Sequence, residues 1–72
     1  MGKITFRNRT RRTIEVLIPF ESGHDSAAFW PIEPGAEESW NRNSTMVAFI
    51  ERNDGSGIVM LKVSNGQTYN ID

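Results

Sequence analysis

The sequence TMVAFIERNDGSGIVMLKV, residues 45–63, decides the fold class of this chain. The apolar residues of 45–52 occupy both phases of a two-residue alternation: Met46, Ala48 and Ile50 in one, Val47 and Phe49 in the other. Successive side chains of a β-strand point to opposite faces, so this segment is predicted to be the central, most buried strand. Residues 53–57 combine Asn, Asp, Gly and Ser and predict a hairpin loop. Residues 58–63 are again apolar on both sides and predict the partner strand.

Alternation of period two continues outward in both directions, with a turn signal about every ten residues. It predicts further strands at residues 3–7, 13–20, 28–32, 37–42 and 68–71. In the second of these Ile14, Val16, Ile18 and Phe20 share a face, while Pro19 indicates a sheet edge or a bulge. No window shows helical spacing over three turns. We therefore expect residues 1–72 to form a single all-β domain, a compact antiparallel β-sandwich or small barrel of six to seven short strands.

Two turns have specific chemistry. Residues 33–36, Glu-Pro-Gly-Ala, predict a type II turn, because proline presets φ at the second position and glycine accepts positive φ at the third. Asn65-Gly66 predicts a two-residue hairpin with a type I′ turn. The first turn would place Trp30 and Trp40 on adjacent antiparallel strands.

The composition excludes several classes of protein. The chain has 72 residues, no cysteine and one histidine, which excludes disulfides and thiolate metal sites and leaves too few ligands for a multi-histidine zinc site. We expect no cofactor. A net charge of −1 argues against nucleic-acid binding, and no apolar run is long enough for a transmembrane segment. The first residues alternate like a strand and do not resemble a signal peptide, so a cytoplasmic location is expected, with non-classical secretion left open.

Catalytic groups are sparse. His24 lies in a glycine-containing loop beside Asp25, with Ser22 and Ser26 near it, and neighbours on one irregular loop rarely hold a catalytic triad in place. Adjacent Glu37 and Glu38 would point to opposite faces of a strand and cannot act together. The loop at 53–57 offers calcium a single carboxylate, which turn chemistry alone explains. We expect a protein that is not an enzyme and binds no metal.

Four arginines, Arg7, Arg9, Arg11 and Arg12, lie within six residues that contain no acid. In an extended segment Arg7, Arg9 and Arg11 would fall on one side and could bind phosphate, sulfate or an acidic partner. The alternative is a sheet edge kept soluble by charge. Aromatic residues are not interleaved with the arginines, as single-stranded nucleic acid would require.

The tryptophans are the best candidates for a binding site. Trp40 is followed by Asn41 and Arg42, and Trp30 lies across the predicted turn. An indole face packs on the apolar C–H face of a sugar ring, while amide and guanidinium groups bond its hydroxyls. The leading hypothesis is a lectin-like carbohydrate-binding module whose ligand is a carbohydrate or glycoconjugate. Its expected site residues are Trp40, Trp30, Arg42, Asn41, His24 and Asp25. The alternative is that one or both tryptophans fill the thin core.

A second hypothesis assigns the protein a structural or interaction role. Residues 45–52 and 58–63 are apolar on both faces, more than one thin sandwich needs to cover. The surplus predicts a homo-oligomer that assembles through the sheet, which would also multiply weak single sugar sites. Recognition of an anionic ligand by the arginines is the third hypothesis.

Overall fold

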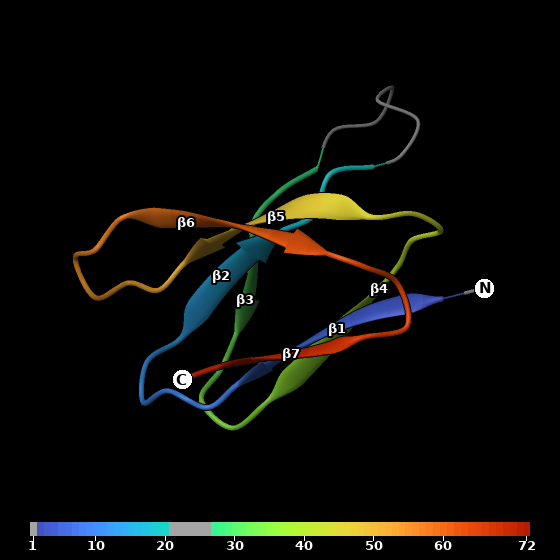
Figure 1. The fold of residues 1–72 in the computed structure, drawn as a ribbon. Coiled ribbons are helices and arrows are strands. Elements are labelled where there is room, and N and C mark those ends of the chain that lie inside the picture. Colours follow the sequence, from blue (N-terminus) through green and yellow to red (C-terminus); the bar gives the residue numbers. More distant parts are fainter. Residues whose placement is uncertain (1, 21–26) are drawn as a thin grey trace.

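The computed structural model describes residues 2–20 and 27–72 and contains seven strands (Figure 1). They are β1 (Lys3–Asn8), β2 (Ile14–Leu17), β3 (Trp30–Ile32), β4 (Glu37–Asn41), β5 (Met46–Glu51), β6 (Ile58–Val63) and β7 (Thr68–Ile71). Over these residues the chain forms no helix, and hence no helix that could cross a membrane. The predicted all-β class is confirmed, and the last two strands have the predicted bounds.

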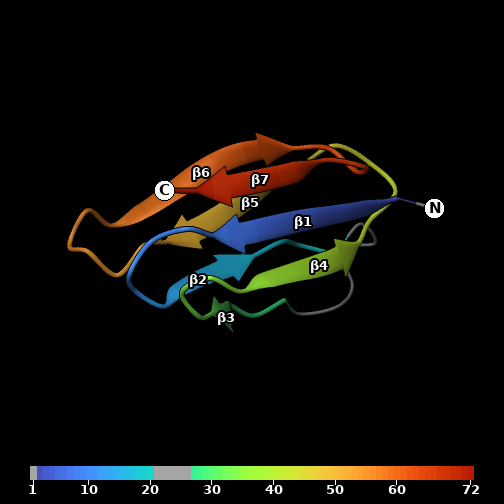
Figure 2. The ribbon, with the colours of Figure 1, turned by 90° about the horizontal axis from the view of Figure 1, so that it is seen from below.

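The strands form two sheets that pack face to face as a small sandwich (Figures 1 and 2). One sheet has the order β4-β1-β7 and the other the order β3-β2-β5-β6. All pairings are antiparallel except that of β1 with β7, which is parallel. The chain leaves one sheet at the end of β6 and enters the other as β7, which brings β7 alongside β1 in the same direction. Antiparallel pairing was therefore the correct expectation for every pair but this one.

The core lies between the two sheets and follows the predicted alternation. Its buried apolar residues are Ile4, Phe6, Ile14, Val16, Ile18, Ile32, Ala48, Ile50, Val63 and Ile71. Phe6 lies at the centre of an aromatic group, with its ring centroid 6.0 Å from that of Trp40 and 5.5 Å from that of Tyr69. Phe20 departs from its predicted phase and is 40% exposed, because β2 ends at Leu17, before Pro19.

The prediction that residues 45–52 form the most buried strand is only half right. β5 lies inside its sheet, between β2 and β6, and its inward residues Ala48 and Ile50 are buried. No layer of the described chain covers the outward face, however, where Val47 is 44% exposed. β6 is an edge strand rather than an interior one.

One of the two predicted turns is confirmed and the other is not. At residues 33–36 the Ala36 amide donates to the Glu33 carbonyl over 3.0 Å, and Gly35 has φ of 81°, as a type II turn requires. The prediction of a type I′ hairpin at Asn65-Gly66 is wrong. Gly66 has φ of 83° but Asn65 does not have positive φ, and β6 and β7 belong to different sheets. The turn instead bonds to β1, since the Gly66 amide donates to the Lys3 carbonyl over 2.7 Å.

Asn8 is a fully buried polar residue at the end of β1. Its amide nitrogen donates to the carbonyls of Arg12 (2.7 Å) and Ile32 (2.8 Å), and its amide oxygen accepts from the backbone amide and the hydroxyl of Thr10. Its backbone amide donates to the Ala36 carbonyl, and its carbonyl accepts from the Gly35 amide. Asn8 thus joins β1, the turn that follows it, the end of β3 and the turn at 33–36.

We expect Asn8→Ala to lower the free energy of unfolding by about 2–4 kcal/mol, because it leaves buried carbonyl and amide groups without partners. Chemical denaturation followed by tryptophan fluorescence measures the change. Asn70→Ala, at an exposed position of β7, is the matched control and should change it by less than about 0.5 kcal/mol. Equal effects of the two substitutions would contradict the role given to Asn8.

Candidate functional site

A hollow opens between the two sheets, on the side where β3 and β4 are the edge strands. We call it the inter-sheet hollow. Its volume is about 570 Å³, within the range of pockets that hold small molecules. Its lining residues are Ile18, Phe20, Ala27, Ala28, Trp30, Ser39, Trp40, Asn41 and Arg42. Four of the six residues expected at a sugar site are therefore brought together.

The route by which the two tryptophans meet differs from the prediction. β3 pairs with β2 and β4 pairs with β1, so Trp30 and Trp40 are not on adjacent strands. In register, Trp30 lies opposite buried Val16 and Trp40 opposite buried Ile4, so each indole is on the inward phase of its own sheet. The two side chains therefore line the hollow from opposite sheets.

The indoles differ in exposure. Trp40 is half-buried and packs edge-on against Phe6, with an interplanar angle of 87°. Trp30 is 54% exposed. Each of the two expectations for the tryptophans, core packing and exposure, therefore describes one of them. Trp40 forms a wall that continues the core, and Trp30 offers the open aromatic surface.

Arg42 is 8% exposed, and backbone carbonyls surround its guanidinium. Nε donates to the Pro19 carbonyl (2.9 Å), Nη2 to the Ile18 carbonyl (2.9 Å) and Nη1 to the carbonyl of Asn41 (2.7 Å). These bonds occupy carbonyls that a longer β2 would have offered to a neighbouring strand. Arg42 thus holds the chain after β2 against the end of β4.

The same guanidinium also supports an aromatic ring. The Cζ atom of Arg42 lies 4.7 Å from the centroid of Phe20, in cation–π geometry. Phe20 and the alanines at 27 and 28 line the hollow but were not predicted as site residues. The period-two phase of Phe20 suggested a core position, and only the arginine 22 residues later explains where the ring lies.

The other expected site residues lie at the rim of the inter-sheet hollow or outside the residues that the structure describes. Asn41 is exposed and has the opposite phase to Trp40, so it borders the hollow at its rim. Ser39 is also exposed, and its hydroxyl shares a 2.8 Å hydrogen bond with that of Thr5. His24 and Asp25 lie outside the described residues.

The segment that carries the four arginines is extended only to the end of β1, and residues 10–12 form a bend. Arg7 forms a 3.5 Å ion pair with Glu37 on the β4 flank of β1, whereas Arg9 forms a 3.1 Å ion pair with Asp72, which follows β7. Arg11 and Arg12 border a smaller hollow of about 150 Å³ whose other residues are Thr10, Arg52, Asp54 and Asp72. Three arginines and two aspartates therefore line this smaller hollow.

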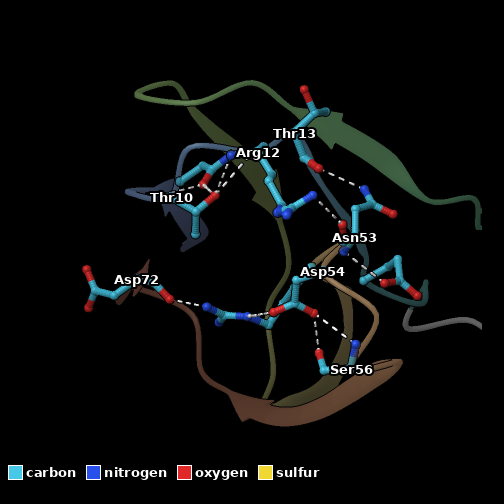
Figure 3. Close-up of polar contacts among 10 residues, drawn as sticks. Thr10, Arg12, Thr13, Asn53, Asp54, Ser56 and Asp72 are labelled. Atoms are coloured by element: carbon cyan, nitrogen blue, oxygen red, sulfur yellow. Dashed lines mark hydrogen bonds and ion pairs between the residues drawn. The ribbon is translucent and has the colours of Figure 1, made fainter.

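Figure 3 shows the polar contacts of the loop at 53–57 and of the residues around it. Nη1 of Arg12 donates to the carbonyl of Asn53, whose side-chain amide donates to the Thr13 carbonyl over 2.7 Å. Arg52 contacts the Asp54 carboxylate at 3.5 Å and donates to the carbonyl of Asp72. Within the described residues no group of three His, Cys, Asp or Glu could hold a metal ion.

At this end of the molecule, neighbouring groups lower the pKa of Asp54. Its carboxylate accepts hydrogen bonds from the hydroxyl and the backbone amide of Ser56, and these bonds, with the charge of Arg52, lower the pKa of Asp54. The arrangement is that of a turn stabilised by its own side chain.

Comparison with known proteins adds no further assignment. No protein-family model, no curated protein and no solved structure matches this chain.

The different burial of the two tryptophans predicts different effects on stability. We expect Trp40→Ala to lower the free energy of unfolding by about 2–4 kcal/mol, because it removes packing against Phe6 and the core. Trp30→Ala should cost less than about 1 kcal/mol, since more than half of that side chain is exposed. Urea denaturation of both variants, followed by far-ultraviolet circular dichroism, measures the two losses of unfolding free energy. A larger loss for Trp30→Ala than for Trp40→Ala would contradict the assignment of Trp40 to the core and Trp30 to the surface.

We expect Ser56→Ala to raise the pKa of Asp54 toward its ordinary value, because the hydroxyl donor is the largest cause of the shift. The native interaction stabilises the loop while Asp54 is ionised and is lost as the pH falls through the lowered pKa. NMR titration of the Asp54 carboxyl carbon measures the pKa directly. Ser39→Ala, on β4, should leave the titration of Asp54 unchanged.

Proposed function

We propose that the protein is a non-enzymatic, lectin-like module that binds a carbohydrate or glycoconjugate in the inter-sheet hollow. The observation that supports it best is the exposed indole of Trp30 at an open hollow whose opposite wall is the indole of Trp40. Aromatic side chains that line an open hollow are typical of ligand-binding sites. A pyranose has an apolar C–H face that an indole can cover.

The remaining lining residues fit this chemistry. Asn41 at the rim offers an amide donor and acceptor to sugar hydroxyls. Arg42 acts mainly as a positioning residue, since its guanidinium donates to three protein carbonyls and its charge supports Phe20. Small side chains at residues 27 and 28 leave room beside Trp30. His24 and Asp25 remain predicted contacts, and the cytoplasmic location remains a prediction.

Anion binding by the arginines receives less support from the geometry. Arg7 and Arg9 each form an ion pair with a carboxylate, and the two pairs lie on opposite flanks of β1. An anionic ligand would have to displace these carboxylates. It would also bind in a strongly salt-dependent way, whereas stacking of a sugar on an indole should respond little to salt.

The sugar proposal predicts that the native protein binds defined glycans on a printed array and that Trp30→Ala reduces that binding at least about tenfold, equivalent to about 1.4 kcal/mol. Trp30→Phe keeps an aromatic face and should retain a substantial part of the affinity. The affinity of each hit is then measured by titration calorimetry with the free monovalent saccharide, so that multivalency does not enter.

Val47→Ala is the matched control, because it shortens an exposed apolar side chain outside the hollow. It should leave the affinity unchanged. An array on which the native protein and Trp30→Ala give the same profile would overturn the proposal. Binding that disappears in moderate salt and survives Trp30→Ala would favour the arginines instead.

A further inference from the structure

β6 has less protection against pairing than the other three edge strands. β3 is three residues long and contains Pro31, β4 begins with Glu37 and Glu38, and β7 is four residues long with alternate polar residues. These are devices by which proteins prevent edge-to-edge association. β6 has six residues, and its only charge is that of Lys62. Along one border of the molecule it therefore presents an open backbone ladder (Figure 2).

The side chains of β6 are also unusually exposed for their type. Ile58, Val59 and Met60 are 55%, 45% and 69% exposed. On the outward face of the sheet Met60 lies opposite Phe49, and Phe49 lies opposite Leu17. An apolar row thus runs across β2 and β5 and ends at the open edge, at Met60.

We propose that two copies of this chain associate by antiparallel pairing of β6 with β6, around a two-fold axis at Met60. The two four-stranded sheets then become one sheet of eight strands. The apolar row of one copy continues into that of the other through the two Met60 side chains.

Symmetry limits the possible registers. In a two-fold antiparallel pair a residue must lie opposite its own equivalent, because neighbouring residues point to different faces. Centring on Met60 or on Leu61 gives the largest overlap of the six-residue strand. The Leu61 register would place Lys62 opposite Met60, in the apolar row. The Met60 register places Lys62 opposite Ile58 of the second copy, outside that row.

Charge also favours the register centred on Met60. Glu15 and Glu51 lie directly opposite each other on β2 and β5, on the outward face, and Ile58 is the next residue in the same cross-strand row. Like charges in this arrangement are unfavourable, and no ion pair among the described residues includes either glutamate. Lys62 of the second copy would extend this row two strand spacings, about 10 Å, from Glu51. Extended lysine and glutamate side chains can approach each other over that span.

The assembly closes on itself. The far edge of the four-stranded sheet is β3, where Pro31 cannot donate to another strand. Pairing through β6 therefore gives a dimer rather than a fibre. The inter-sheet hollow lies by β3 and β4, away from β6, so this inference does not depend on sugar binding.

Sedimentation equilibrium of the full chain from low micromolar to submillimolar concentration tests the dimer. We expect Met60→Lys to weaken it at least about tenfold, because two ammonium groups would meet at the axis. Met60 is 69% exposed, so the variant should fold. Val47→Glu is the control on the same face, one strand inward and opposite Lys62, and should leave the edge pairing intact.

A cysteine scan tests the register, because the chain has no cysteine of its own. Met60→Cys should form an intermolecular disulfide on mild oxidation, whereas Leu61→Cys and Val47→Cys should not. A native protein that is strictly monomeric at every concentration would overturn the proposal. So would a dimer that survives Met60→Lys and is lost in Val47→Glu, since that pattern indicates stacking of the outward faces.

Discussion

The side chain of Asn8 has two donors and two acceptor positions, and all four are used inside the protein. Its bond to the Ile32 carbonyl ties β1 of one sheet to the end of β3 in the other. The turn at 33–36 joins β3 and β4, which belong to different sheets. Because Asn8 bonds to this turn and to the end of β3, it fixes the point at which the two strands diverge. The inter-sheet hollow lies between their far ends. Burying an amide is unfavourable unless it is fully bonded, so few other side chains could replace this one.

Local patterns predicted which residues form strands and which side of each strand is buried. Residues 58–63 and 68–71 have the predicted bounds, and Ile14, Val16 and Ile18 have the predicted phase. The partition into two sheets could not be predicted in the same way, because it depends on contacts far apart in sequence. Asn65-Gly66 illustrates this: the same dipeptide permits a hairpin, but bonds to β1 make it a crossover between sheets.

The sequence predicted which residues line the candidate site better than it predicted how they are arranged. Trp30, Trp40, Asn41 and Arg42 do line one hollow. Their roles diverge because their contacts differ: Phe6 packs against Trp40, while no ring among the described residues makes such a contact with Trp30. An arginine two residues after a tryptophan suggested a ligand contact, yet the guanidinium of Arg42 donates to the carbonyls of Ile18 and Pro19. No local signal places those carbonyls 23 and 24 residues away within reach.

The parallel pairing of β1 with β7 has a kinetic consequence. Residues 3–8 cannot complete their sheet until residues 68–71 have been synthesised, so the ladder closes a loop of nearly the whole chain. Long-range closure of this kind slows folding. The local hairpin of β5 and β6 can form while the sheet that covers Ile50 and Val63 still lacks β7. Until β7 pairs with β1, the apolar residues of β5 and β6 are therefore incompletely covered, and such transiently exposed surface favours aggregation.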